Sequence, residues 1–202
     1  MTMWYDKHNQ GKGAKPMIGA LPGTTIETDL SRDDAAQALL SPLFLTGGLV
    51  LSQVSQLTGL EPYVIQNWIK RGFVSPPKNK KYSRGQLCRI ATINLLKDCL
   101  RLDQITRLLS YLNGNLTDES DDLIDDFELY ATITRLVFRL ERSPQSGREE
   151  WQAWCAQVLE DYAEPYPGAR DRVRRGLQVI ITAYAAARLK GRAEQMLRAL
   201  DL

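Results

Sequence analysis

The sequence has few of the residues that metal binding and catalysis need. It contains one histidine, His8, and three cysteines, Cys88, Cys99 and Cys155, which lie far apart and form no C-x-x-C pair. Structural zinc sites need about four N or S ligands at short spacings, and many nucleophiles need a histidine base held in place. The sequence therefore predicts no metal site, no cofactor, no catalytic residue and no enzymatic activity.

Long apolar runs are also missing. No run approaches the roughly 20 residues that span a bilayer, and Met1–Gln10 contains no apolar core of a signal peptide. Hydrophobic residues make up 44% of the chain and charged residues 25%, as in ordinary globular proteins. We expect a cytoplasmic, nucleoid-associated protein without membrane contact.

Charge is unevenly distributed along the chain, although the net charge is only +2. Residues 50–110 hold ten basic and three acidic side chains, a net +7, whereas residues 111–164 hold four basic and thirteen acidic, a net −9. A basic block of this kind favours a polyanionic partner. A solvated basic face that pairs with the acidic segment is the alternative.

The N-terminal part predicts little regular structure. Glycine and proline recur through residues 1–30, which we expect to form a flexible leader. Residues 31–48 predict a short helix, beginning at Ser31 and ending near Pro42, and then a linker through Gly47 and Gly48.

A helix, a short turn and a second helix are predicted from residue 50 onward. Gly59 can adopt the positive φ that a tight turn needs, and Pro62 is tolerated in the first turn of the second helix. That helix should run to Arg71, with Gly72 at its C-terminal cap. This is the spacing of a helix-turn-helix, although ordinary helical hairpins share it.

The second helix carries two different faces. Ile65, Trp68 and Ile69 share an apolar face, and the opposite face holds the candidate base-reading residues Tyr63, Gln66, Asn67 and Lys70. Asparagine and glutamine can make two hydrogen bonds to adenine in the major groove, and lysine can reach guanine or phosphate. An ordinary polar surface is the alternative, but this face contains no acidic residue.

A basic turn follows this helix. Pro76 and Pro77 force an extended segment, and residues 78–81 predict a turn between two short strands. The candidate phosphate contacts are Arg71, Lys78, Lys80, Lys81, Tyr82 and Arg84. Phosphate contacts supply affinity and register rather than sequence information. A solvated loop is the alternative. Helices predicted from Ser83 and Asp103 would brace this unit.

The same residues resemble a known family. The motifs are L-x-x-V-x-x-L-T-G at Leu51–Gly59, G-F-V-x-P-P at Gly72–Pro77, K-Y-S at Lys81–Ser83 and L-x-L-D-Q-I-x-x-L-L at Leu100–Leu109. Their order and spacing resemble the DNA-binding domain of the MerR family, a winged helix-turn-helix. The chain also resembles an uncharacterised bacterial family that joins such a domain to a helical C-terminal region.

This resemblance implies a mainly α protein in which a winged helix-turn-helix at 49–113 is followed by an α-helical bundle. The bundle, residues 117–202, would be a dimerisation or effector region. Two departures stand out: Tyr63 and Gln66 occupy positions where typical MerR proteins carry arginine, and no single long dimerisation helix follows the domain. No metal-sensing cysteine set is present either, so the identity of an inducer does not carry over.

We therefore expect a transcriptional regulator that binds double-stranded DNA. A homodimer would read a palindromic site, and the helical region could hold a small-molecule effector. One alternative is an excisionase-like architectural protein that bends DNA. The other is a protein-interaction module that has lost DNA binding.

The acidic block between Asp118 and Glu128 allows two interpretations. Seven carboxylates in eleven residues could suggest a metal or general-acid cluster by number alone. The favoured interpretation is an acidic helix N-terminus, which the helix dipole stabilises.

Overall fold

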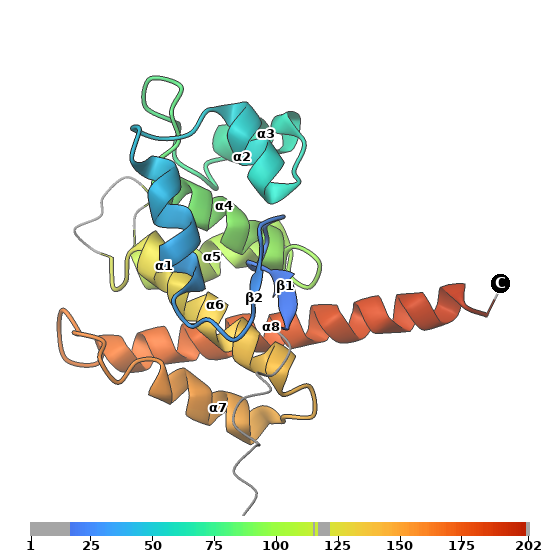
Figure 1. The fold of residues 1–202 in the computed structure, drawn as a ribbon. Helices are drawn as coiled ribbons and strands as arrows, with labels where there is room; N and C mark the ends of the chain where they lie inside the picture. Colours follow the sequence, from blue (N-terminus) through green and yellow to red (C-terminus); the bar gives the residue numbers. More distant parts are fainter. Residues whose placement is uncertain (1–16, 115, 117–121, 201–202) are drawn as a thin grey trace, which may run out of the picture.

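The computed structural model describes residues 17–114, 116 and 122–200, and the protein is mainly helical, as expected (Figure 1). Strands β1 (Ile18–Ala20) and β2 (Glu27–Asp29) pair antiparallel, with Ile18 opposite Asp29. The helices are α1 (Ala35–Leu40), the 3-10 turn η1 (Ser41–Phe44), α2 (Leu51–Thr58), α3 (Pro62–Lys70), α4 (Arg84–Leu96), α5 (Leu102–Asn113), α6 (Asp126–Arg142), α7 (Arg148–Gln157) and α8 (Ala169–Arg198).

The prediction of a flexible leader is wrong for residues 17–30, which form the β1–β2 hairpin. Its loop satisfies polar groups on two helices: the Thr25 amide donates to the Leu57 carbonyl at 2.8 Å, and the Tyr130 hydroxyl donates to the Pro22 carbonyl at 2.7 Å. Carbonyls in the last turn of a helix have no partner within the helix, so α2 gains a cap from this loop. Residues 1–16 of the predicted leader lie outside the described residues.

Gly23 allows the hairpin loop to approach α4 closely. Its φ is +68°, and a Cβ built there would lie 2.0 Å from the Ala91 carbonyl oxygen. Only glycine fits both the backbone conformation and the contact. Gly23, which in the sequence only predicts a break in regular structure, therefore lies at a packing contact with α4.

The first helix begins later than predicted. Ser31 belongs to a turn in which its amide donates to Asp29 Oδ1 at 2.9 Å, and Asp34 is the N-terminal cap of α1. The chain then continues past Leu40 as η1, which accommodates Pro42 in its first turn. The predicted helix is thus shifted toward the C-terminus by a few residues.

The hydrophobic core is continuous from the hairpin to α8. Helix α4 is its centre, with Leu87, Ile90, Ile93 and Leu96 at most 1% exposed, and α6 packs across it. Buried residues of α2, α3, α5 and α8 belong to the same cluster. The helices predicted as a DNA-binding unit and those predicted as a bundle therefore share one core.

Helix α8 runs unbroken from Ala169 to Arg198. Its first half lies against the other helices and its second half extends away from them (Figure 1). Gly191 does not interrupt the helix.

Candidate nucleic-acid interface

Local chemistry positions α2 and α3 as the sequence predicts. Gly59 has a φ of +66° and ends α2, and Pro62 begins α3 after the extended residue Glu61. The Ser55 hydroxyl donates to the Leu60 carbonyl at 2.7 Å and so holds the turn between the helices. Helix α2 itself begins at Leu51, after its N-cap residue Val50.

The two faces of α3 lie as predicted. Ile65 and Trp68 are buried, Ile69 is half-buried, and these side chains fix the helix on the core. The four candidate base-reading residues are all exposed: Tyr63, Gln66, Asn67 and Lys70. Tyr63 is 70% exposed.

The basic turn, Lys78–Lys81, has a defined backbone. Asn79 and Lys80 have φ values of +50° and +60°, and the Lys81 amide donates to the Lys78 carbonyl at 2.9 Å. Two consecutive residues with positive φ are typical of a type I′ turn, the usual turn of a tight hairpin. The flanking chain forms isolated bridges, Lys78 to Lys81 and Leu49 to Tyr82, rather than the two short strands predicted.

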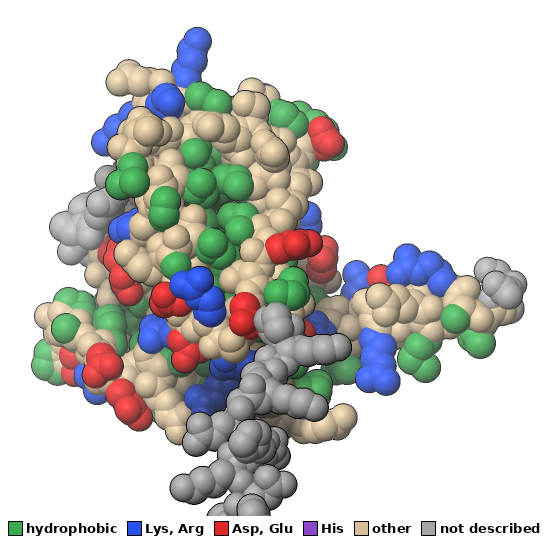
Figure 2. All heavy atoms as spheres, in the orientation of Figure 1, with side chains coloured by type: hydrophobic (Ala, Val, Ile, Leu, Met, Phe, Trp, Pro, Cys, Tyr) green, Lys and Arg blue, Asp and Glu red, His purple; other side chains and the backbone are tan. Residues whose placement is uncertain are grey.

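Positive charge is concentrated at this end of the molecule. Lys78, Lys80, Lys81 and Arg71 are exposed, and the Arg71 guanidinium lies 4.6 Å from the centre of the Phe73 ring. Figure 2 shows Lys and Arg side chains at the upper left of the molecule, over the loop that follows α3, while the visible surface over α2 and α3 carries few of them. The exposed face of α3 and the basic turn thus belong to the same end of the fold.

Tyr82 is not at the surface, contrary to the sequence prediction. It is 3% exposed, its backbone pairs with Leu49 in both directions, and burial raises the pKa of its phenol. Neighbouring side chains of an extended segment point to opposite sides. Lys81 and Ser83 are exposed, so Tyr82 between them faces the core, where its backbone pairs with Leu49. The phosphate-contact assignment of Tyr82 is therefore wrong for this conformation.

Arg84 is engaged within the protein. It is half-buried, its guanidinium lies 3.8 Å from the centre of the Phe127 ring, and it donates to Ser41 Oγ at 3.4 Å. These contacts connect the start of α4 with α6 and η1. Arg84 therefore has a packing role, and its predicted phosphate contact would require these interactions to break.

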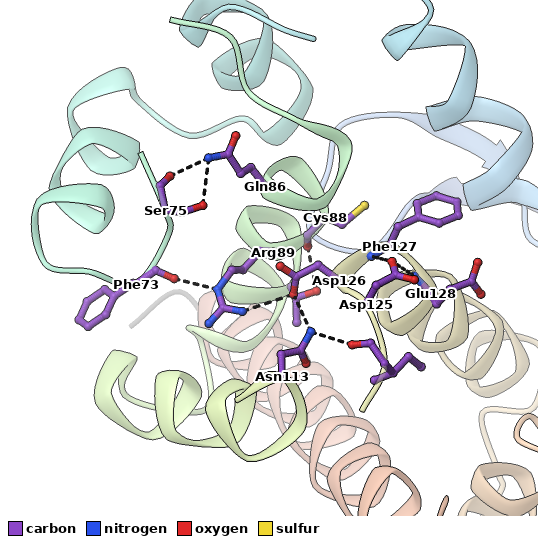
Figure 3. Close-up of polar contacts among 12 residues, drawn as sticks. Phe73, Ser75, Gln86, Cys88, Arg89, Asn113, Asp125, Asp126, Phe127 and Glu128 are labelled. Atoms are coloured by element: carbon purple, nitrogen blue, oxygen red, sulfur yellow. Dashed lines mark hydrogen bonds and ion pairs between the residues drawn. The ribbon is translucent and has the colours of Figure 1, made fainter. Parts of the chain in front are cut away.

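Gln86 holds the segment between α3 and the basic turn. Its Oε1 accepts from the Ser83 amide at 2.8 Å, and Ser83 Oγ accepts from the Gln86 amide, which confirms Ser83 as the cap of α4. Its Nε2 donates to the Ser75 and Pro76 carbonyls at 2.8 and 3.1 Å. One side chain therefore both caps a helix and fixes the approach to the turn (Figure 3).

A buried polar network links this segment to the C-terminal helices (Figure 3). Arg89 Nε donates to the Phe73 carbonyl at 3.0 Å, and Nη1 lies 3.4 Å from Asp126 Oδ1. Asn113 Nδ2 reaches the same oxygen at 3.4 Å and donates to the Ile124 carbonyl at 2.8 Å. The chain after α3 is thereby connected to α4, α5 and α6.

Gln86, Arg89 and Asn113 are not among the functional residues predicted from the sequence. A signal for Arg89 is present, since it is the one charged residue in the apolar run from Leu87 to Ile93. A charge on a helix face that faces the core is rarely tolerated without a partner. No comparable signal marks Asn113, because its partners lie beyond the next loop.

The acidic block has a structural role where it is described. Asp125 caps α6, with Oδ1 accepting from the Phe127 and Glu128 amides at 2.8 and 3.1 Å, and Asp126 and Glu128 lie in the first turn. Residues 118–121 of the block lie outside the described residues. Helix α5 begins at Leu102, before the predicted start at Asp103, and the Arg101 amide at its N-cap donates to Gln104 Oε1 at 2.9 Å.

Over the described ranges, no group of three or more His, Cys, Asp and Glu side chains is placed to hold a metal ion. Cys88 and Cys155 are buried and Cys99 is exposed, and all three are free thiols. No helix in the described part of the chain is long and apolar enough to cross a membrane.

Comparison with known proteins finds a match to a family model and a match to a curated protein. Residues 47–133 match the family model called "Domain of unknown function (DUF1836)". This range contains α2 to α5 and the start of α6. The chain is 31% identical over 104 residues to "Uncharacterized protein YkrK" of Bacillus subtilis (strain 168), a match that covers 50% of this chain and 45% of that protein. No solved structure gives a significant match.

Proposed function

We propose that the protein is a DNA-binding transcriptional regulator that uses α2, α3 and the basic turn as a winged helix-turn-helix. Helix α3 would enter the major groove, and the basic turn would lie over the phosphate backbone. The observation that carries the proposal is the exposed face of α3. It presents two amides, a lysine and a tyrosine with no acid, and the basic turn follows it directly.

One feature of the structure and one of the sequence support this assignment. The short helices α2 and α3 are held rigidly by Trp68, by the Ser55 hydrogen bond and by the hairpin cap on α2. A rigid element positions base-reading side chains more accurately than a loop does. The net charge of +7 over residues 50–110 favours association with a polyanion.

The exposed residues divide into two roles. Gln66 and Asn67 would contact base edges, because their amides can form paired hydrogen bonds with adenine. Arg71, Lys78, Lys80 and Lys81 would contact phosphates and fix the register. A homodimer would place two copies of α3 on half-sites separated by about one helical turn of DNA, or a multiple of it.

In-vitro selection from random duplexes at near-physiological salt tests the proposal. A recovered palindromic motif is the expected result, and it would also give the half-site spacing. Weak, salt-sensitive retention without a motif would favour the architectural alternative. No retention would refute DNA binding and leave the interaction-module alternative.

Charge reversal of the turn provides a second test. Lys78→Glu should weaken binding to all duplexes alike and reduce the salt dependence, with a loss of roughly 0.9 in slope per phosphate contact. Lys97→Glu is the matched control, since Lys97 is also exposed but lies at the far end of α4. Equal effects of the two substitutions would mean that the turn makes no specific phosphate contact.

A further inference from the structure

A groove opens between α7, α8 and the loop that joins α4 to α5. Its volume is about 530 Å³. Sites that hold small molecules typically measure about 300 to 1,000 Å³, with mostly apolar walls and a few polar groups that orient the ligand. Helix α4 begins beside the basic turn and ends just before this groove, so the groove lies at the far end of α4 from the proposed DNA contacts.

Most of the groove's wall is apolar. Its apolar members come from the loop, α7 and α8, and they are Leu100, Trp151, Val179, Ile181, Ala183 and Ala186. The indole nitrogen of Trp151 donates to Ser146 Oγ at 3.0 Å, so the ring has no polar atom left to satisfy. Val179 is 46% exposed. A ligand with an apolar body would remove this surface from water.

The charged groups of the wall are both arginines. Arg148, the first residue of α7, and Arg175 of α8 line the groove, and no aspartate or glutamate is among the described residues that line it. The Arg175 guanidinium lies 2.6 Å from Asp171 Oδ2, which offsets its charge. Arg148 has no ion-pair partner among the described residues. The wall therefore favours a ligand with one negative charge.

The two arginines lie toward opposite ends of the groove. Helices α7 and α8 pack together and run antiparallel (Figure 1), and each arginine is the first residue of its helix in the wall. The uncompensated charge of Arg148 is therefore at one end, one helical turn before Trp151. A guanidinium binds a carboxylate through two parallel hydrogen bonds, a geometry that other anion-binding side chains do not offer.

We propose that this groove binds a small amphipathic carboxylate. Arg148 holds the carboxylate, and the apolar body lies along Trp151 and the α8 side chains that include Val179. Gln152 and Gln178, which also line the groove, offer amide donors beside it. The single uncompensated cation and the apolar wall together exclude an organic cation and disfavour a strongly polar anion such as a nucleotide.

The position of the groove gives the ligand a route to the DNA-binding face. The Cys99 and Leu100 amides donate to the Leu96 carbonyl at 3.1 and 2.9 Å, so this part of the wall continues the end of α4. At the other end of α4, Gln86 holds the segment before the basic turn. A ligand between Leu100 and α8 would shift α4, so we expect ligand affinity and DNA affinity to be coupled reciprocally. This step rests on the proposed function.

Protection of Cys99 locates the ligand without any substitution. Cys99 is exposed and lines the groove, whereas Cys88 and Cys155 are buried, so Cys99 should react first with iodoacetamide. Octanoate at ten times its Kd should slow this reaction about tenfold in the full chain. Octanol and octylammonium, which match its length without the negative charge, should protect far less. No protection by octanoate, or equal protection by all three, would overturn the proposal. Protection that grows with protein concentration alone would mean that a second copy fills the groove, and would also overturn it.

Arginine variants test which group holds the carboxylate, with calorimetric titration of octanoate as the measurement. Arg148→Gln should raise the Kd at least about tenfold. Arg175→Gln should change it less than about threefold, because Asp171 already offsets that charge. Arg192→Gln is the control outside the groove, since Arg192 is exposed on α8. Equal effects of the three substitutions would mean that octanoate is attracted only by net charge, which would contradict the site.

The coupling is tested with the duplex recovered by selection. Saturating octanoate should change the Kd for that duplex at least about fivefold, and Arg148→Gln should remove the change. A protein that binds octanoate and duplex without coupling would refute the effector role. Octanoate binding without any duplex binding would refute the proposed function alone, whereas duplex binding without octanoate binding would refute the groove alone.

Discussion

Arg89 and Asp126 join α4 to α6 through an ion pair with an N–O distance of 3.4 Å, and Arg89 is only 4% exposed. The same guanidinium donates to the carbonyl of Phe73, just after α3. The exposed face of α3 is therefore tied through one side chain to the helices that carry α8. A shift of α6 would reach the loop that precedes the basic turn.

Removal of this side chain should destabilise the whole fold. Arg89→Met leaves the Phe73 carbonyl and the half-buried Asp126 carboxylate with fewer partners, and we expect the free energy of unfolding to fall by about 3 kcal/mol. Urea unfolding measures the change. Arg107→Met is the control, since Arg107 pairs with Asp103 while 75% exposed, and it should cost less than about 1 kcal/mol. Equal losses would show that the buried pair contributes no more than a surface pair.

The close approach of the hairpin to α4 gives a second prediction. Gly23→Ala forces a Cβ to within 2.0 Å of the Ala91 carbonyl, so the hairpin must separate from α4. Gly47→Ala is a matched control, because Gly47 also has a positive φ, +89°, but a Cβ there meets nothing within 4 Å. The control should lower the free energy of unfolding by about 1 kcal/mol through backbone strain, and Gly23→Ala should lower it by clearly more. Thermal unfolding measures the stability of both variants. Equal losses of stability would contradict the close packing of Gly23 on α4.

Cys155 should make stability fall at alkaline pH. Burial raises its pKa from 9.0 to about 11, so between these values the folded thiol keeps a proton that the unfolded chain has lost. Stability is therefore unaffected by this group below pH 9 and declines as pH rises, by up to about 1.4 kcal/mol per pH unit until about pH 11. Unfolding of wild type and Cys155→Ala between pH 8 and 11 isolates this slope. Parallel curves for the two proteins would rule out the contribution.

Lys80→Gly should change stability and DNA binding in opposite directions. Glycine adopts the φ of +60° without strain and is the preferred residue at this position of a type I′ turn, so stability should rise by about 0.5 to 1 kcal/mol. The lost ammonium should reduce affinity for every duplex and lower the salt slope by about 0.9. Calorimetry and salt-dependent gel shifts measure the two effects. Unchanged DNA affinity would remove Lys80 from the phosphate contacts.

The α3 face should control sequence preference without supporting the fold. Gln66→Ala and Asn67→Ala should each cost about 1 to 3 kcal/mol on the selected site and little on unrelated DNA. Both side chains are exposed, so the unfolding free energy should stay within about 0.5 kcal/mol. Gln56→Ala, an exposed glutamine on α2, is the control. A uniform loss on all sequences would mean that these amides do not read bases.

Local signals predicted several ends of α2, α3 and α4 correctly. Each of these signals affects only the backbone within about four residues, through its conformation or a cap, and they come from Gly59, Pro62, Gly72 and Ser83. The sequence alone therefore determines where α2 ends and where α3 and α4 begin. The alternation of apolar and polar residues likewise determined which side of α3 is exposed. The basic turn followed from two prolines and a cluster of lysines.

Contacts between distant residues decided the rest. Tyr82 is buried because Leu49 pairs with it across 33 residues, and Arg84 packs on Phe127 across 43. The hairpin is ordered because its loop caps α2 and contacts α4, and neither helix is visible to a local pattern at residues 17–30. The sequence by itself determined where α2 ends, where α3 and α4 begin, and which face of α3 is exposed. Burial depends on which elements the chain brings together. Only the tertiary structure therefore decided which basic and aromatic side chains remain at the surface.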